Sequence, residues 1–244
     1  MTTVRVALAL IAAAALAACG HIPSGGLQDA MDALNPVGAP APPPVRLADA
    51  PRRAPQTGDT FIYGRSTVRR VVQVSGQRIE WATTDDRRYT TSPHFFTPLL
   101  AFDTAFEQRR SELRGNPAAL WPLQVGRSVE FDELRTTRQT TLGLERRSTL
   151  RWRCEVTDAR HVSVPAGDYD SFHVRCEARL PDLAWRGAVQ VMAWDYAPAL
   201  GHYVRRQWYE GSRLRETVLS AALPGTVASR TRIDATLQRL QQSP

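Results

Sequence analysis

The amino-acid sequence predicts a mainly β protein, built as a single antiparallel sheet that is curved and open or rolled into a partial barrel, with minor helices. Two observations support this fold class. Apolar and polar residues alternate strictly over residues 150–156 and 172–177, which is the period of half-buried strands. Short strand-like segments also recur along the chain between glycine-containing turns, as they do in antiparallel sheets.

The two alternating segments are interpreted as one hairpin. Its apolar face carries Leu150, Trp152, Cys154, Val156, Phe172, Val174 and Cys176. Residues 165–169 (PAGDY) are rich in turn formers and are predicted to close the hairpin, which places Val162 opposite Phe172. Bringing Cys154 opposite Cys176 then requires about four extra residues on the first strand, as a bulge or small turn at residues 157–160.

Further strands and two helices are expected along the chain. The strand-like segments are residues 61–63, 68–74, 78–82, 129–137, 185–196, 203–209 and 214–219. A short amphipathic helix within residues 95–113 is predicted to cover the sheet. Its apolar positions are Phe102, Phe106 and Leu113. A second helix is predicted at residues 229–242, with an apolar face that either packs on the sheet or binds a partner. That face carries Ile233, Leu237 and Leu240.

The N-terminus has the features of a secretory signal. Arg5 is followed by an apolar run that is too short for a comfortable membrane-spanning helix. The run ends in Leu16-Ala17-Ala18-Cys19, which resembles the lipobox of bacterial lipoproteins. This resemblance implies cleavage before Cys19 and a diacylglycerol on its thiol. Gly20 follows where many retained lipoproteins have aspartate, which implies the periplasmic face of the outer membrane. An ordinary signal peptide with a chance cysteine is the alternative.

Lipidation of Cys19 leaves two cysteines, Cys154 and Cys176, in an oxidising compartment. We therefore expect a Cys154–Cys176 disulfide, with two buried free thiols as the alternative. Closing this loop would stabilise the fold by roughly 3 kcal/mol. A metal site that adds His161 and His173 is disfavoured, because the alternation puts His173 on the face opposite Cys176. No metal is expected.

Composition divides the chain into four segments. Residues 1–18 are predicted to be the signal peptide, and residues 19–57 the lipid anchor and a tether rich in proline and alanine. Residues 58–225 are long enough for one β domain with its own core. Residues 226–244 are assigned to the C-terminal amphipathic helix and tail.

Three motifs lie within residues 118–222. They are WPLQVG at 121–126, VSVPAGDYDSF at 162–172 and WDYAPALGHYV at 194–204. Together they resemble a trio from bacterial cell-envelope proteins with a β-sheet domain of unknown function, of the pattern P-L-x-V-G, V-P-A-G-x-[FY] and Y-A-P-x-[VL]-G. The resemblance implies a fold and an envelope location. It carries over no functional residue.

The chain is basic and contains no lysine: all 31 basic residues are arginine. Arginine pairs bidentately with phosphate and carboxylate, so a basic domain at a membrane can bind lipid headgroups or anionic wall polymers. Nucleic acid is not expected in this compartment. The outward face of the hairpin gathers four arginines, which bind an anionic partner or belong to a salt-bridged, solvated sheet face. These arginines are Arg151, Arg153, Arg175 and Arg179.

Catalytic patterns are absent from the sequence. It contains no G-x-S-x-G elbow, no H-E-x-x-H, no P-loop and no dinucleotide fingerprint. We expect no enzymatic activity and no cofactor; a hydrolase with a cluster of carboxylates in a cleft is the alternative. His94 and His202 flank turn residues and are interpreted as turn or surface histidines.

Two functions fit these features. The first is a non-enzymatic adaptor, anchored in the outer membrane, that binds an envelope protein or a cell-wall polymer. The second is a carrier or sensor of a lipid or other amphiphile in a curled sheet, to which Trp81, Trp121, Trp185, Trp194 and Trp208 contribute apolar surface. A cavity lined by these aromatic residues favours the carrier, and a filled core with an exposed apolar or arginine-rich patch favours the adaptor.

Overall fold

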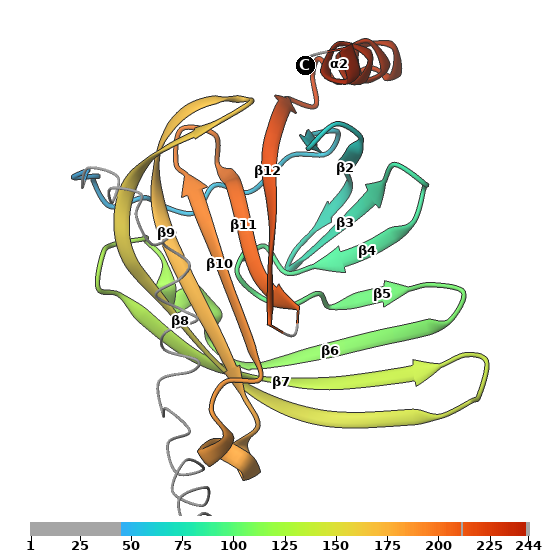
Figure 1. Cartoon of the computed structure of the whole chain (residues 1–244), viewed down its shortest axis with the longest axis vertical. Helices are drawn as coiled ribbons and strands as arrows, with labels where there is room; N and C mark the ends of the chain where they lie inside the picture. Colours follow the sequence, from blue (N-terminus) through green and yellow to red (C-terminus); the bar gives the residue numbers. More distant parts are fainter. Residues whose placement is uncertain (1–44, 211, 243–244) are drawn as a thin grey trace, which may run out of the picture. The chain divides into compact units, whose positions relative to one another are not determined.

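The computed structural model describes residues 45–210 and 212–242, and within these residues twelve antiparallel strands form a closed barrel (Figure 1). Each strand pairs with its neighbours along the sequence. The strands are β1 (Thr60–Tyr63), β2 (Thr67–Ser75), β3 (Arg78–Thr83), β4 (Arg88–Thr91), β5 (Ala101–Asp103), β6 (Glu107–Gly115), β7 (Ser128–Gln139), β8 (Glu145–Val164), β9 (Gly167–Arg179), β10 (Gln190–Ala197), β11 (His202–Glu210) and β12 (Arg213–Leu223).

Strand β1 closes the barrel because it pairs with strands from both ends of the domain. Its four residues lie opposite residues 67–70 of β2 on one side and residues 219–223 of β12 on the other. The predicted open sheet or partial barrel is therefore wrong. That prediction did not include β4, β5 and β6, whose pairings complete the ring between β3 and β7.

The segment at residues 95–113 forms a loop, β5 and β6 in place of the predicted helix. In β6 the half-buried positions are Glu107, Arg109, Ser111 and Leu113, so the alternation is present but its inner face is mostly polar. A helix prediction that relied on sparse apolar residues could not recognise this strand. The preceding loop enters the barrel, where Phe96 is fully buried.

The β8–β9 hairpin has the predicted strands but a different turn. Val164 pairs with Gly167, so the loop is only Pro165-Ala166, and Val162 lies opposite Tyr169. A single-residue bulge between Val156 and Asp158 then brings Cys154 opposite Cys176. The predicted five-residue loop and its compensating insertion are wrong. The predicted Cys154–Cys176 disulfide is confirmed, with an S–S bond of 2.04 Å.

The remaining segments are short helices and an N-terminal strap. The helices are η1 (Pro117–Leu120), η2 (Pro181–Arg186) and α2 (Arg230–Gln242). Helix η2 occupies the beginning of a stretch that was predicted as strand, and β10 starts only at Gln190. Residues 45–57, part of the predicted tether, lie against the barrel: Val45 N donates to Ala159 O at 3.1 Å, and Ala50 bridges to Leu123. No helix in the described ranges has the length and apolarity needed to cross a membrane.

Strand β10 is buried on both faces. Met192, Trp194 and Tyr196 belong to the main hydrophobic core, whereas Asp195 on the opposite face binds His173 Nδ1 at 2.7 Å and Arg205 Nε at 2.5 Å. Burial raises the pKa of Asp195, but the hydrogen bond and charge of His173, with Arg205, hold it below its usual value. The inward face of β10 leads directly into the candidate site.

Candidate functional site

The inward faces of the strands enclose a cavity of about 170 Å³. Its wall is largely aromatic, supplied by Trp81, Tyr89, Trp121, Trp152, Trp194 and Tyr203. Three tryptophans that the sequence singled out therefore line it: Trp81, Trp121 and Trp194. Trp185 instead lies on η2 with 77% of its surface exposed. The arrangement can accept an apolar group.

Ring stacking holds the cavity wall in place. Trp81 and Tyr89, paired across β3 and β4, stack with their planes 5° apart. The loop after β4 places Phe95 on Tyr196, with ring centroids 4.8 Å apart. Because large rings that pack on one another have few alternative rotamers, the wall is rigid, and its shape is set before any ligand enters.

His202 lies at one end of this wall. Its Nε2 is 2.7 Å from the Tyr63 hydroxyl, and its ring stacks on Phe61 with centroids 3.7 Å apart. Burial, and then the positive charge of Arg69, lower the pKa of His202 to about 3. His94 is also buried; burial, and then the charge of Arg52, lower its pKa to about 4. Both histidines flank turns, as predicted, but neither is a surface residue, because the barrel covers them.

The depressed pKa of His202 predicts acid-sensitive stability. The unfolded chain takes up this proton near pH 6.5 and the folded chain only near pH 3, so stability is full above pH 6.5 and falls as the pH drops towards 3. We expect the free energy of unfolding to be lower at about pH 5 than at neutral pH, and His202 to account for about 2 kcal/mol of this loss. Urea unfolding of His202→Gln against pH should show a shallower slope. The control His161→Gln, at an exposed site, should keep the wild-type slope; equal slopes in all three chains would refute the assignment.

Arg69 points from β2 into the cavity and has no acidic partner among the described residues. Its Nη1 donates to the Tyr203 hydroxyl at 2.6 Å, and its guanidinium carbon lies 4.9 Å from the centre of the Tyr63 ring. It is half-buried and lines the cavity. The Arg69 guanidinium therefore has no carboxylate to neutralise its charge, and it is not fully hydrated.

Arg206 enters the same cavity from β11, opposite Trp194 of β10. Its guanidinium carbon lies 5.0 Å from the Trp208 ring. Its Nε is buried and has no hydrogen-bond partner within the described chain. Burial, and then the like charge of Arg69, lower the pKa of Arg206. Both guanidinium groups line this one cavity.

Two further arginines at the cavity are neutralised by glutamates. Arg109 Nη2 lies 2.8 Å from Glu107 Oε1. Arg135 binds the fully buried Glu133 through Nε and Nη2, both at 2.9 Å. Glu133 also accepts hydrogen bonds from Ser111 Oγ at 2.6 Å and Trp152 Nε1 at 2.9 Å. This carboxylate is saturated with donors, so it stabilises the barrel rather than offering a free base.

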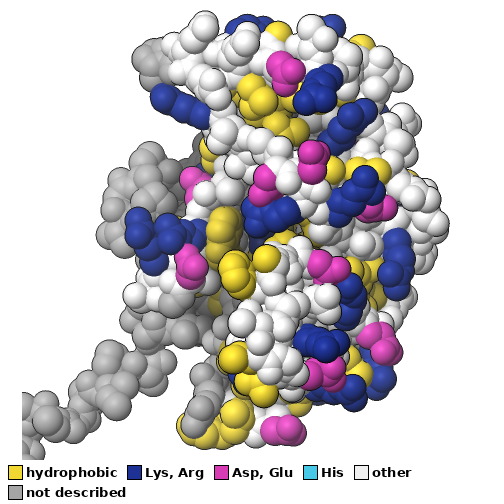
Figure 2. Space-filling model, turned by 90° about the vertical axis from the view of Figure 1, so that its right-hand side faces the viewer, with side chains coloured by type: hydrophobic (Ala, Val, Ile, Leu, Met, Phe, Trp, Pro, Cys, Tyr) yellow, Lys and Arg dark blue, Asp and Glu magenta, His cyan; other side chains and the backbone are white. Residues whose placement is uncertain are grey.

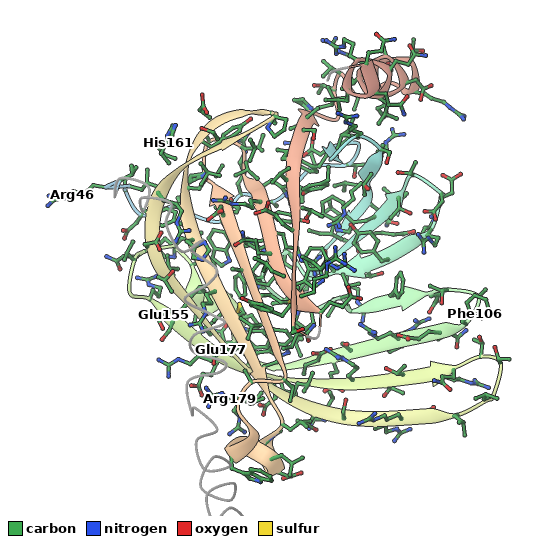
Figure 3. All side chains as sticks on the ribbon, in the orientation of Figure 1. Arg46, Phe106, Glu155, His161, Glu177 and Arg179 are labelled. Carbon is green, nitrogen blue, oxygen red and sulfur yellow. A yellow bond between two sulfur atoms is a disulfide. The ribbon has the colours of Figure 1, made fainter. Side chains whose placement is uncertain are left out.

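The four hairpin arginines lie together on the outer face of β8 and β9, and each has a carboxylate partner. Arg151 contacts Asp132 at 3.0 Å, and Glu177 lies between Arg175 at 2.6 Å and Arg179 at 3.0 Å. Arg153 is 3.8 Å from Glu130. Figure 3 shows Glu155, Glu177 and Arg179 on this outer side. An anionic partner would have to compete with these carboxylates, and binding there stays a prediction.

Three further predictions, on lipidation, metal binding and enzymatic activity, do not depend on the cavity wall. Cys19 lies outside the described residues, so lipidation stays a prediction. Within residues 45–210 and 212–242, no three or more His, Cys, Asp or Glu side chains are grouped to hold a metal ion. The absence of enzymatic activity likewise stays a prediction.

Adjacent arginine pairs in the sequence are a signal for the inward-facing arginines. Adjacent arginine pairs on strands must send one member to each face. Arg69 faces the cavity while Arg70 is exposed, and Arg206 lines the cavity while Arg205 binds Asp195 on the other face. The pairs were visible in the sequence, but only the closed barrel gives the inward members a common interior.

An exposed apolar tip lies at the ends of two hairpins. Thr140 N donates to Phe106 O at 3.0 Å, which joins the β7–β8 connection to the β5–β6 connection. Phe106, Leu142 and Leu144 are 75%, 68% and 61% exposed. Figure 3 shows Phe106 at the far end of its hairpin, and Figure 2 shows apolar side chains on this side among basic and acidic ones. The tip is a surface that a partner can cover.

The fold and the cavity together define a class: a closed antiparallel β-barrel with an aromatic interior that holds unpaired arginines. No protein-family model matches the sequence, and no curated protein matches it. Similar solved structures are the hypothetical lipoprotein YmcC from Escherichia coli, with 11% identity over 68% of this chain and 84% of that chain (TM-score 0.46), and a candidate exported protein with a YmcC-like fold from Bacteroides fragilis, with 14% identity over 71% and 99% (TM-score 0.38). A candidate lipoprotein from Parabacteroides distasonis has 12% identity over 72% and 100% (TM-score 0.33).

Proposed function

We propose that this protein is a lipid-anchored envelope protein whose barrel binds a small ligand, as a carrier or sensor. The observation that supports this most strongly is the aromatic cavity of about 170 Å³ inside the barrel. Cavities lined by hydrophobic and aromatic side chains with a few polar groups are the usual form of a small-molecule site. Here Arg69, Arg206 and Tyr203 are those polar groups.

The volume of the cavity limits the ligand. An apolar cavity of about 150 Å³ accommodates one benzene ring, whereas pockets for drug-sized molecules measure about 300 to 1,000 Å³. A cavity of about 170 Å³ therefore encloses a ring-sized group or the end of a chain. A whole membrane lipid would leave most of its acyl chains outside.

Membrane attachment is the second part of the proposal. Cys19 carries the lipid, and the segment that follows it holds the barrel at the periplasmic face of the outer membrane. We expect Cys19→Ala to move the protein from the membrane fraction to the soluble periplasmic fraction, because the thiol that receives diacylglycerol is gone. Fractionation followed by immunoblotting measures this. Ser24→Ala, in the same segment, is the control and should stay with the membrane; retention of the Cys19→Ala chain would contradict lipidation at this residue.

An adaptor that binds another envelope protein is the second candidate function. The exposed tip of Phe106, Leu142 and Leu144 favours it, because contiguous apolar side chains at a surface mark interaction sites. Arg138 and Arg146 beside the tip have no ion-pair partner among the described residues and suit an acidic partner surface. Under this proposal the cavity is only a packing defect of the barrel.

Native mass spectrometry separates the two candidates. The whole chain with Cys19→Ser is exported, purified from the periplasm without detergent, and weighed under native conditions. We expect a bound mass that extracts into organic solvent, since the aromatic wall is formed before the ligand enters. A Trp194→Ala chain is the matched comparison and should lose the bound mass. A clean ligand-free mass for Cys19→Ser would count against the carrier and leave the adaptor.

A further inference from the structure

We propose that the ligand carries one acidic group, a carboxylate or a phosphate, and that Arg69 and Arg206 bind this group inside the barrel. The inference rests on the proposed ligand-binding function and specifies its chemistry. The ring-sized apolar part of the ligand would lie against the aromatic wall, and its anionic oxygens would face the two guanidinium groups.

Arg206 is the strongest indication that the ligand is an anion. Its Nε is buried without a hydrogen-bond partner, and no ion pair involves it among the described residues. A buried charged donor without a partner carries a large desolvation cost, which folded proteins relieve by pairing. An oxygen anion in the cavity would supply that pairing, because a guanidinium presents a planar set of donors that matches carboxylate and phosphate.

Arg69 adds a second cation and an orienting contact. The Tyr203 hydroxyl receives its Nη1 proton at 2.6 Å, and the Tyr63 ring lies beneath its guanidinium at 4.9 Å. These contacts fix the direction of the side chain. Positioned donors lose little conformational entropy when a ligand binds.

The glutamates near the cavity do not neutralise Arg69 and Arg206, because other side chains already engage them. Glu107 is engaged by Arg109, and Glu133 is engaged by Arg135, Ser111 and Trp152. Among the described residues that line the cavity, five are arginines and none is an aspartate or glutamate. The lining is therefore positive overall, and an anion that binds there is attracted rather than repelled.

Three probes that share one ring system test the charge of the ligand. Binding of benzoate, phenyl phosphate and neutral benzamide to the Cys19→Ser whole chain is followed by quenching of tryptophan fluorescence. We expect at least one anion to bind about tenfold more tightly than the amide, since a charge-assisted hydrogen bond contributes that much. The preferred anion distinguishes a carboxylate ligand from a phosphate ligand.

Arginine variants then locate the acidic group. Arg206→Met should lower the affinity for the preferred anion by about tenfold and leave the affinity for benzamide unchanged. Arg70→Met is the matched control, because Arg70 adjoins Arg69 in sequence but is exposed; it should bind all three probes like the parent chain. Arg206→Gln provides the same test if the methionine chain does not fold. The unfolding midpoint of Arg206→Met should not fall, since Arg206 has no ion pair to lose and methionine can still pack against Trp208.

The outcomes separate the two proposals. Equal affinities for the anions and the amide, or an anion preference that survives in both Arg206 variants, would overturn the acidic ligand and leave a neutral ligand-binding barrel. Binding of none of the three probes, together with a ligand-free mass of the exported chain, would overturn the ligand-binding function itself.

Discussion

Replacing Glu133 with alanine is expected to lower the free energy of unfolding by about 3 to 5 kcal/mol, the usual cost of removing one partner of a buried ion pair. The side chain of Glu133 is 1% exposed and accepts four hydrogen bonds. Its removal leaves the Arg135 guanidinium and the Trp152 N–H without their acceptor inside the barrel. Urea unfolding followed by tryptophan fluorescence measures the loss.

The chain contains a matched control for this prediction. Glu145 and Arg147 have the same identities and the same spacing along a strand as Glu133 and Arg135, but their side chains are 44% and 80% exposed. Glu145→Ala should barely change stability, because exposed ion pairs are solvated and screened. Similar losses in both variants would mean that burial does not determine the contribution of Glu133.

The second large effect is expected at the disulfide. The double variant Cys154→Ala/Cys176→Ala should be less stable than the parent chain by about 3 kcal/mol, because the bond closes a long loop of the unfolded chain. The two cysteines are 22 residues apart and fully buried. Urea unfolding without reductant measures the difference.

Reduction provides the control for the disulfide variant. Dithiothreitol should bring the parent chain to the stability of the double variant and leave the double variant unchanged. Peptide mapping of the parent chain under non-reducing conditions should recover Cys154 and Cys176 in one linked peptide. Two freely alkylated thiols in the exported protein would contradict the bond.

The hairpin with the disulfide was predictable because its alternation is apolar on one face and charged on the other. The register was not, since a one-residue bulge at Thr157 leaves no signal in the sequence. The closed barrel could not be predicted for a different reason, because β6 turns Glu107, Arg109 and Ser111 towards the interior. A strand whose inward face is polar lacks the alternation of apolar and polar residues by which strands are recognised in a sequence.

The candidate site could be predicted only in part. Tryptophans such as Trp81 and Trp194 suggested an apolar cavity, and three of the five singled out do line it. The arginines at the site were passed over in favour of the hairpin arginines, because Arg151 and its neighbours are close in sequence. Arg69 and Arg206 are 137 positions apart in numbering and meet only because the barrel closes. Tertiary closure, which no local pattern encodes, creates this site.

The pairing of β1 with β12 has a consequence for how the chain matures. Thr60 lies opposite Leu223, so the ring cannot be completed until the chain as far as Leu223 is available for pairing. Until then, the growing sheet has one edge at β1 and another at the last strand to emerge. Unpaired edges are templates for aggregation, and pairings between distant residues form slowly. The chain is therefore expected to be most prone to aggregation while β12 is not yet available to pair with β1.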